Sequence, residues 1–95
     1  MIMADLQDRV RDRLRTVLDP ETGRDLLAMG MIYGIQADDK GHVRVDMTTT
    51  TRGCPLADFL RQGVEAALQT VEGVASVDVR LVWEPPWTPD RMAPV

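Results

Sequence analysis

The sequence is poor in the side chains that build structural metal sites and covalent cross-links. Its 95 residues contain one cysteine, Cys54, and one histidine, His42. A single cysteine cannot form an intrachain disulfide and suits a reducing compartment, so we expect a cytoplasmic protein. These two residues alone also cannot supply the ligands of a structural zinc site or of an iron–sulfur site with four thiolates.

Excess basic charge and long apolar runs are absent as well. Eleven Lys and Arg against 15 Asp and Glu give a net charge of −4 and an isoelectric point near 4.8. Nucleic acids and anionic membranes attract basic surfaces, so we expect neither as a partner. No apolar stretch approaches the roughly 20 residues of a membrane span. Residues 1–5 lack the basic-then-apolar layout of a signal peptide.

The composition that is present is typical of a small globular domain. Hydrophobic residues make up 44% of the chain and charged residues 27%, which argues against disorder. A chain of 95 residues has room for one core. We therefore expect one domain over residues 1–95, including a tail over residues 83–95 that is rich in proline and tryptophan.

Apolar residues near the N-terminus have the spacing of an amphipathic helix over residues 5–18. The predicted buried stripe consists of Leu6, Val10, Leu14, Val17 and Leu18. The helix should end at Asp19-Pro20, because the residue before a proline is pushed out of the helical region and proline has no N–H to donate.

Alternating apolar residues predict two strands, over residues 31–37 and 42–48, joined by a polar turn that contains a glycine. One face of the first strand should carry Met31, Tyr33, Ile35 and Ala37.

A second helix should begin at Pro55, because proline is favoured at the first helical position, and should end near residue 71. Residues 75–81 alternate again and predict a third strand. The order α-β-β-α-β, followed by the tail, predicts an α+β fold, a small two-layer sandwich with the helices on one face of the sheet.

Cys54 is the strongest candidate for a chemical role. It directly precedes Pro55, where the unpaired N–H groups and the dipole of a helix stabilise an anion. Thiolates in such positions have lowered pKa values and act as nucleophiles or soft-metal ligands, so Cys54 is a candidate metal ligand. A lone cysteine is also commonly a small buried apolar residue, and the sequence leaves both interpretations open.

Two further groups are weaker candidates. The threonine run over residues 48–51 would place the hydroxyls of Thr50 and Thr51 beside Cys54, although threonine also suits the end of a strand. Asp19 and Glu21 could hold a proton or a hard metal ion, although Asp-Pro-Glu is also common in turns.

The remaining candidates are His42 and the two tryptophans. His42 begins the second predicted strand and Cys54 follows its end, so we expect an exposed histidine and no Cys–His dyad. Trp83 and Trp87 would either form a partner-binding surface or fold back with their rings covering the core. Gly-rich phosphate loops, paired Cys-x-x-Cys motifs and Gly-x-Ser-x-Gly turns are absent from the sequence.

Together these motifs resemble the SufT/PaaD-like family of metal–sulfur (iron–sulfur) cluster assembly factors. The resemblance covers residues 8–92 and rests on four segments: Asp19-Pro20-Glu21, residues 25–33, the Thr-Thr-Thr-Thr-Arg-Gly-Cys-Pro run, and the double-tryptophan ending over residues 81–92. Thr22 departs from the pattern, because relatives often carry an aliphatic residue there.

The resemblance implies a role for the chain as an accessory factor that helps iron–sulfur proteins mature. It implies a functional patch made of Asp19, Glu21, Thr50, Thr51 and Cys54, in which Cys54 is a transient ligand or a carrier thiolate. The implied partners are the iron–sulfur assembly machinery and client apo-proteins.

One thiolate cannot hold a cluster in a monomer. No cofactor should therefore be tightly bound, and any cluster should be transient or shared across a homodimer or with another protein. The alternatives are a cysteine-dependent acyl- or sulfur-transfer enzyme and a purely structural adaptor.

Overall fold

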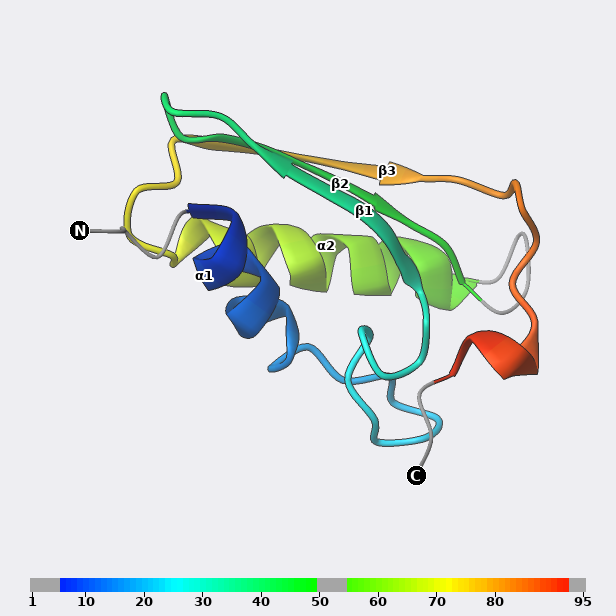
Figure 1. Ribbon diagram of the computed structural model, residues 1–95. Helices are drawn as coiled ribbons and strands as arrows, with labels where there is room; N and C mark the ends of the chain where they lie inside the picture. The colour runs from blue at the N-terminus through cyan, green and yellow to red at the C-terminus, as the bar shows by residue number, and fades with distance from the viewer. Residues whose placement is uncertain (1–5, 50–54, 93–95) are drawn as a thin grey trace.

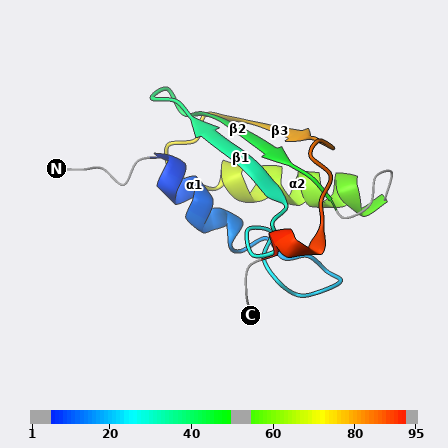
Figure 2. The ribbon, with the colours of Figure 1, turned by 45° about the vertical axis from the view of Figure 1, so that its right-hand side comes forward.

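The computed structural model describes residues 6–49 and 55–92. Within these ranges the elements follow the predicted order α-β-β-α-β, and both helices lie on one face of the sheet (Figures 1 and 2). The elements are α1 (Leu6–Leu14), β1 (Ile32–Ala37), β2 (His42–Met47), α2 (Pro55–Gln69), β3 (Ser76–Leu81) and the short 3-10 helix η1 (Pro89–Arg91). No helix in the described ranges has the length and apolar character needed to cross a membrane.

The sheet has three strands in the order β1-β2-β3. β1 and β2 form an antiparallel hairpin, whereas β2 and β3 are parallel. A parallel pair needs a crossover connection, and α2 lies within that connection. At the centre of the sheet, Val45 of β2 pairs with Ile35 on one side and Val79 on the other.

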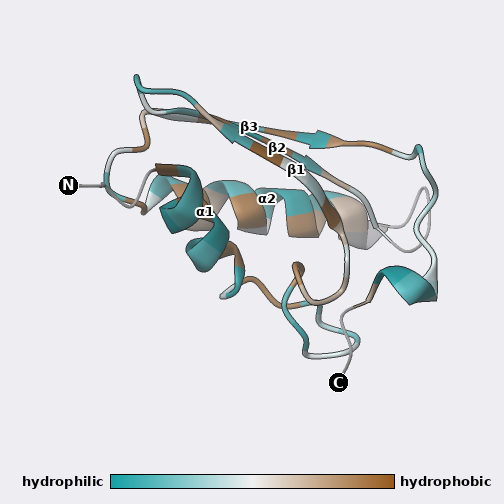
Figure 3. Ribbon diagram, viewed as in Figure 1, coloured by the Kyte–Doolittle hydropathy of each residue, from teal (hydrophilic) through white to brown (hydrophobic). Residues whose placement is uncertain are grey.

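The core lies between the sheet and the two helices. Hydrophobic and hydrophilic residues alternate along both helices (Figure 3), as expected for helices that bury one side. The buried residues of the helices are Val10, Leu14, Ala57, Leu60, Val64 and Leu68, and those of β2 are Val43, Val45 and Met47.

The first helix is shorter than predicted. α1 ends at Leu14, and the next three N–H groups bond to carbonyls three residues earlier, which tightens the chain into turns. Leu18 then pairs with Asp25 in an isolated bridge. The prediction that Leu18 belongs to the buried stripe is wrong, because the chain has left the helix before it and Leu18 is 52% exposed.

The alternation predicted for the first strand is also wrong at one position. The pairing of β1 with β2 shifts between Ile32 and Gly34, which leaves Tyr33 as the extra residue of a β-bulge. Tyr33 therefore does not share the buried face of Ile35. It lines a cavity together with Asp46, whose neighbours in β2, Val45 and Met47, are buried toward the helices.

The tail folds back onto the domain. We call residues 83–92 the strap. Trp87 packs against the core, and its indole N–H donates to the carbonyl of Met29 at 2.7 Å. The hydroxyl of Tyr33 donates to the carbonyl of Pro85 at 2.8 Å. The sequence left open whether the tryptophans form a partner-binding surface or fold back over the core. Trp87 folds back over the core.

The strap approaches the backbone closely at Gly30. Its φ angle is +71°, a conformation that side chains disfavour. A Cβ atom at this position would lie 2.2 Å from the carbonyl oxygen of Arg91, far inside van der Waals contact. Two independent constraints therefore require glycine at this position.

We predict that Gly30→Ala lowers the free energy of unfolding by about 2 kcal/mol or more, because it adds a backbone clash to the cost of positive φ. Gly23→Ala is the matched control, since Gly23 has a φ of +72° with no atom within 4 Å of the added Cβ. It should cost only about 1 kcal/mol. Denaturant unfolding measures both, and equal losses would contradict the close approach of the strap.

Candidate functional site

Three of the predicted site residues, Thr50, Thr51 and Cys54, lie outside the described residues. The described part of the candidate site consists of the turn that carries Asp19 and Glu21, the start of the threonine run at Thr48 and Thr49, and the beginning of α2. These segments show how the chain arranges the surroundings of the predicted patch.

Asp19 is buried and holds its own turn together. The residue is 3% exposed, and its carboxylate accepts hydrogen bonds from the N–H of Glu21 at 3.3 Å and from the hydroxyl of Thr22 at 3.2 Å. The backbone closes the same turn, because the N–H of Gly23 donates to the carbonyl of Asp19 at 2.8 Å. These contacts are the turn chemistry that the sequence left as the alternative to a direct chemical role.

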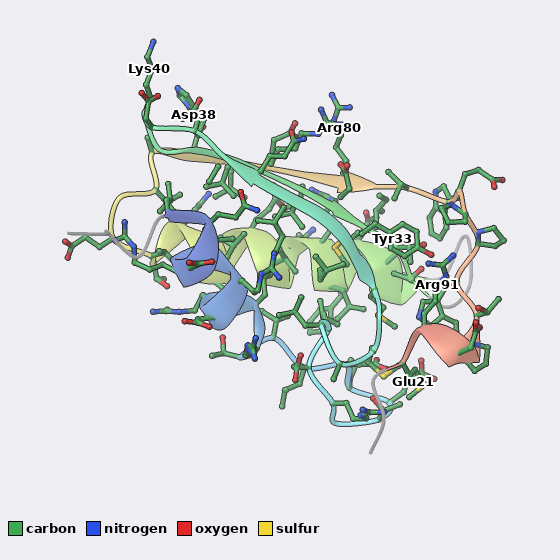
Figure 4. The ribbon with its side chains drawn as sticks, viewed as in Figure 1. Glu21, Tyr33, Asp38, Lys40, Arg80 and Arg91 are labelled. Carbon is green, nitrogen blue, oxygen red and sulfur yellow. The ribbon has the colours of Figure 1, made fainter. Side chains whose placement is uncertain are left out.

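Glu21 differs from Asp19 because it is exposed on the same loop, at the lower end of the molecule in Figure 4. Of the two carboxylates, Glu21 is therefore the one accessible to another molecule. The pair predicted from the sequence divides into a buried residue that shapes the loop and an exposed residue at the surface.

Thr22, the residue that departs from the family pattern, connects this turn to its neighbour. Its hydroxyl lies 3.2 Å from the carboxylate of Asp19 and 3.3 Å from the sulfur of Met29. Sequence reasoning missed this role and treated Thr22 only as a departure. The available signal was the spacing, because a threonine hydroxyl three residues after an aspartate is well placed to bond to it.

The threonine run begins with two residues that are buried in the protein. Thr48 and Thr49 are buried, and the N–H of Thr48 donates to the carbonyl of Met31 at 2.8 Å. Because Thr22 contacts Met29 and Thr48 bonds to Met31, the segment from Met29 to Met31 joins the Asp19 turn to the start of the threonine run.

The second helix begins at Pro55, as predicted. It runs for 15 residues, and Ala57 and Leu60 in its first turns are buried in the core. The positive end of its dipole therefore has a fixed position, and the residue before it in the sequence is Cys54.

His42 lies at the other end of the molecule. Figure 1 shows the β1–β2 hairpin tip and the start of α2 at opposite ends. His42 is exposed, as predicted, and its Nδ1 lies 2.7 Å from the hydroxyl of Ser76. Its backbone N–H donates to the carboxylate of Asp38 and is the main reason why the pKa of Asp38 lies below the ordinary value.

Among the described residues, no three His, Cys, Asp or Glu side chains converge in a way that could hold a metal ion. With one cysteine in the chain, the donor set also does not fit a resident four-thiolate cluster.

Comparison with known proteins is consistent with this architecture. Residues 7–79 match the family model described as iron–sulfur cluster assembly protein. The Fe–S protein maturation auxiliary factor YitW of Bacillus subtilis is 38% identical over 88 residues, which cover 93% of this chain and 86% of the relative. The auxiliary factor SufT of Staphylococcus aureus is 39% identical over 77 residues, covering 81% and 88% of the two chains.

Solved structures have the same fold. A domain of unknown function from Bacillus anthracis superposes with a TM-score of 0.88 at 35% identity, covering 93% of this chain and 84% of that one. A conserved hypothetical protein from Thermotoga maritima gives 0.84 at 42% identity, covering 99% and 92%. An iron–sulfur cluster carrier protein of Mycobacterium leprae is 35% identical over 78 residues, which form only 20% of its length.

We predict that Asp19→Ala lowers the free energy of unfolding by about 1–3 kcal/mol, because the hydroxyl of Thr22 and the backbone N–H of Glu21 lose a charged acceptor. Asp19→Asn keeps one acceptor oxygen and should cost less. Glu21→Gln, at the exposed position of the same turn, should change stability by less than about 0.5 kcal/mol. Denaturant unfolding measures the series, and an Asp19→Ala protein as stable as Glu21→Gln would rule out the structural role of Asp19.

Proposed function

Because the chain belongs to the iron–sulfur cluster assembly protein family, as a SufT-like member, we propose that it is an auxiliary factor in the maturation of iron–sulfur proteins, with Cys54 as a transient ligand or carrier thiolate. The observation that carries the proposal is the start of α2 at Pro55, directly after the only cysteine of the chain. The first turns of this helix are held by Ala57 and Leu60 in the core, so its N–H groups and dipole offer a preorganised site for a thiolate.

In this proposal the cluster is cargo. A single thiolate leaves most of the iron coordination to other groups, so the cluster is shared with a second copy of the chain, a donor or a client. Thr50 and Thr51 would donate hydrogen bonds to the thiolate or to the cargo. The partners are the assembly machinery and client apo-proteins, and the compartment is the cytoplasm.

The two carboxylates have different parts in this proposal. Glu21 is exposed and would orient a partner or tune the local charge. Asp19 acts through the turn that it closes, so it is a positioning residue. Trp83 and Trp87 stay candidates for partner binding, with Trp87 restricted to the part of its ring that the core leaves exposed.

The alternatives are a thiol enzyme and a purely structural adaptor. Acyl or sulfur transfer by Cys54 would need a general base close to the thiol. The only histidine, His42, lies at the hairpin end and already bonds to Ser76, which disfavours it as that base. An adaptor in which Cys54 is inert would require none of the thiolate chemistry.

We predict that Cys54→Ser fails to support cluster loading. In cells that lack the wild-type gene, the iron and acid-labile sulfide of purified iron–sulfur enzymes should fall to the level of the gene deletion, because serine does not replace a thiolate as a soft ligand. Ser76→Ala, at the hairpin end, is the control and should load clients normally. Full client occupancy with Cys54→Ser would refute the thiolate role and favour the adaptor.

We predict that the pKa of the Cys54 thiol lies below the ordinary value of about 8.5, because the helix start stabilises the thiolate. The rate of alkylation by iodoacetamide, measured against pH, gives the midpoint directly. His42→Ala should leave this midpoint unchanged. A midpoint at the ordinary value would contradict the helix-start account, whereas a lowered midpoint that rises in His42→Ala would favour the enzyme.

A further inference from the structure

A cavity of about 580 Å³ lies where the strap crosses the beginning of β1. Its walls include Ile32, Tyr33, Asp46, Val82, Glu84 and Arg91. Asp46 lies between the buried residues Val45 and Met47 in β2, so the cavity is on the side of the sheet that faces away from the helices. The volume is in the range of sites for small molecules, which combine apolar walls with a few polar groups.

The geometry of this cavity depends on the bulge at Tyr33. The hydroxyl of Tyr33 donates to the carbonyl of Pro85, and the guanidinium of Arg91 lies 5.1 Å from the centre of the Tyr33 ring. Figure 4 shows Tyr33 and Arg91 next to each other at the strap. The cation–π contact stabilises Arg91 over the ring and leaves its N–H groups able to bond to an anion.

The cavity is lined by opposite charges that do not pair. Within the described ranges, neither Glu84 nor Arg91 takes part in an ion pair, although both line the same cavity. Asp46, by contrast, pairs with Arg44 at 3.3 Å. One carboxylate and one guanidinium are therefore available to a ligand that carries a charge of each sign.

We propose that this cavity binds a free α-amino acid with an apolar side chain. The ligand carboxylate would bond to Arg91, its ammonium group to Glu84, and its side chain would contact Ile32 and Val82. The proposal goes beyond the role in iron–sulfur protein maturation and does not depend on Cys54.

The test uses NMR titration of the aromatic signals of Tyr33, which is the only tyrosine of the chain. L-Leucine should shift these signals saturably with a millimolar Kd. N-Acetyl-leucine lacks the ammonium group and leucinamide lacks the carboxylate, so each should bind about three- to fivefold more weakly, as expected for exposed ion pairs. Absence of saturation, or equal affinity for all three ligands, would overturn the proposal.

Two variants test which residue binds which charged group of the ligand. Glu84→Gln should abolish the preference for leucine over N-acetyl-leucine only, and Arg91→Gln should abolish the preference over leucinamide only. Lys40→Gln, at the hairpin tip far from the cavity in Figure 4, should keep both preferences. Preferences that survive in both cavity variants would refute the assignment.

The indole N–H signal of Trp87 reports whether the strap stays closed, because this group bonds to Met29. If Arg91→Gln opens the strap, Arg91→Lys keeps the charge and should retain the preference for leucine over leucinamide. A closed Arg91→Lys protein that has lost this preference would also count against the proposal.

Discussion

The close approach of two backbones at Gly30 is the constraint on which this end of the molecule depends. The positive φ of Gly30 turns the chain from the Asp19 loop into β1, and its missing side chain leaves room for the carbonyl of Arg91. Its neighbours Met29 and Met31 accept hydrogen bonds from Trp87 and Thr48. Three segments that are distant in the sequence therefore meet at one tripeptide.

This junction also supports the turn around Asp19, which is a surface loop. The carboxylate of Asp19 holds Thr22, and the hydroxyl of Thr22 contacts Met29. Loops that carry function usually depend on a rigid support. Here the support consists of the buried carboxylate of Asp19 and the segment from Met29 to Met31. The exposed Glu21 lies on the loop that they hold.

Local sequence patterns predict the elements well and their long-range connections poorly. The start of α2 at Pro55, the hairpin and the alternation of β3 follow from spacing that is visible within a few residues. The bulge at Tyr33 and the closed strap depend on hydrogen bonds between residues 52 and 58 positions apart, Tyr33 with Pro85 and Trp87 with Met29. No local pattern encodes such contacts. Thr22 is a different case, because its bond to Asp19 spans three residues and was a local signal, whereas its contact with Met29 spans seven.

As a transient ligand the thiolate needs no general base beside it, whereas acyl transfer would need one. A carrier must release its cargo, and a single thiolate that leaves iron coordination to a partner lets ligands exchange one at a time. Four thiolates in one chain would retain the cluster instead. The position of His42 strengthens this argument, because its Nδ1 bonds to Ser76 and its backbone N–H bonds to Asp38, both at the hairpin end. In the proposed role the start of α2 would stabilise the thiolate, and the position of the only imidazole at the opposite end of the molecule favours ligation over acyl transfer.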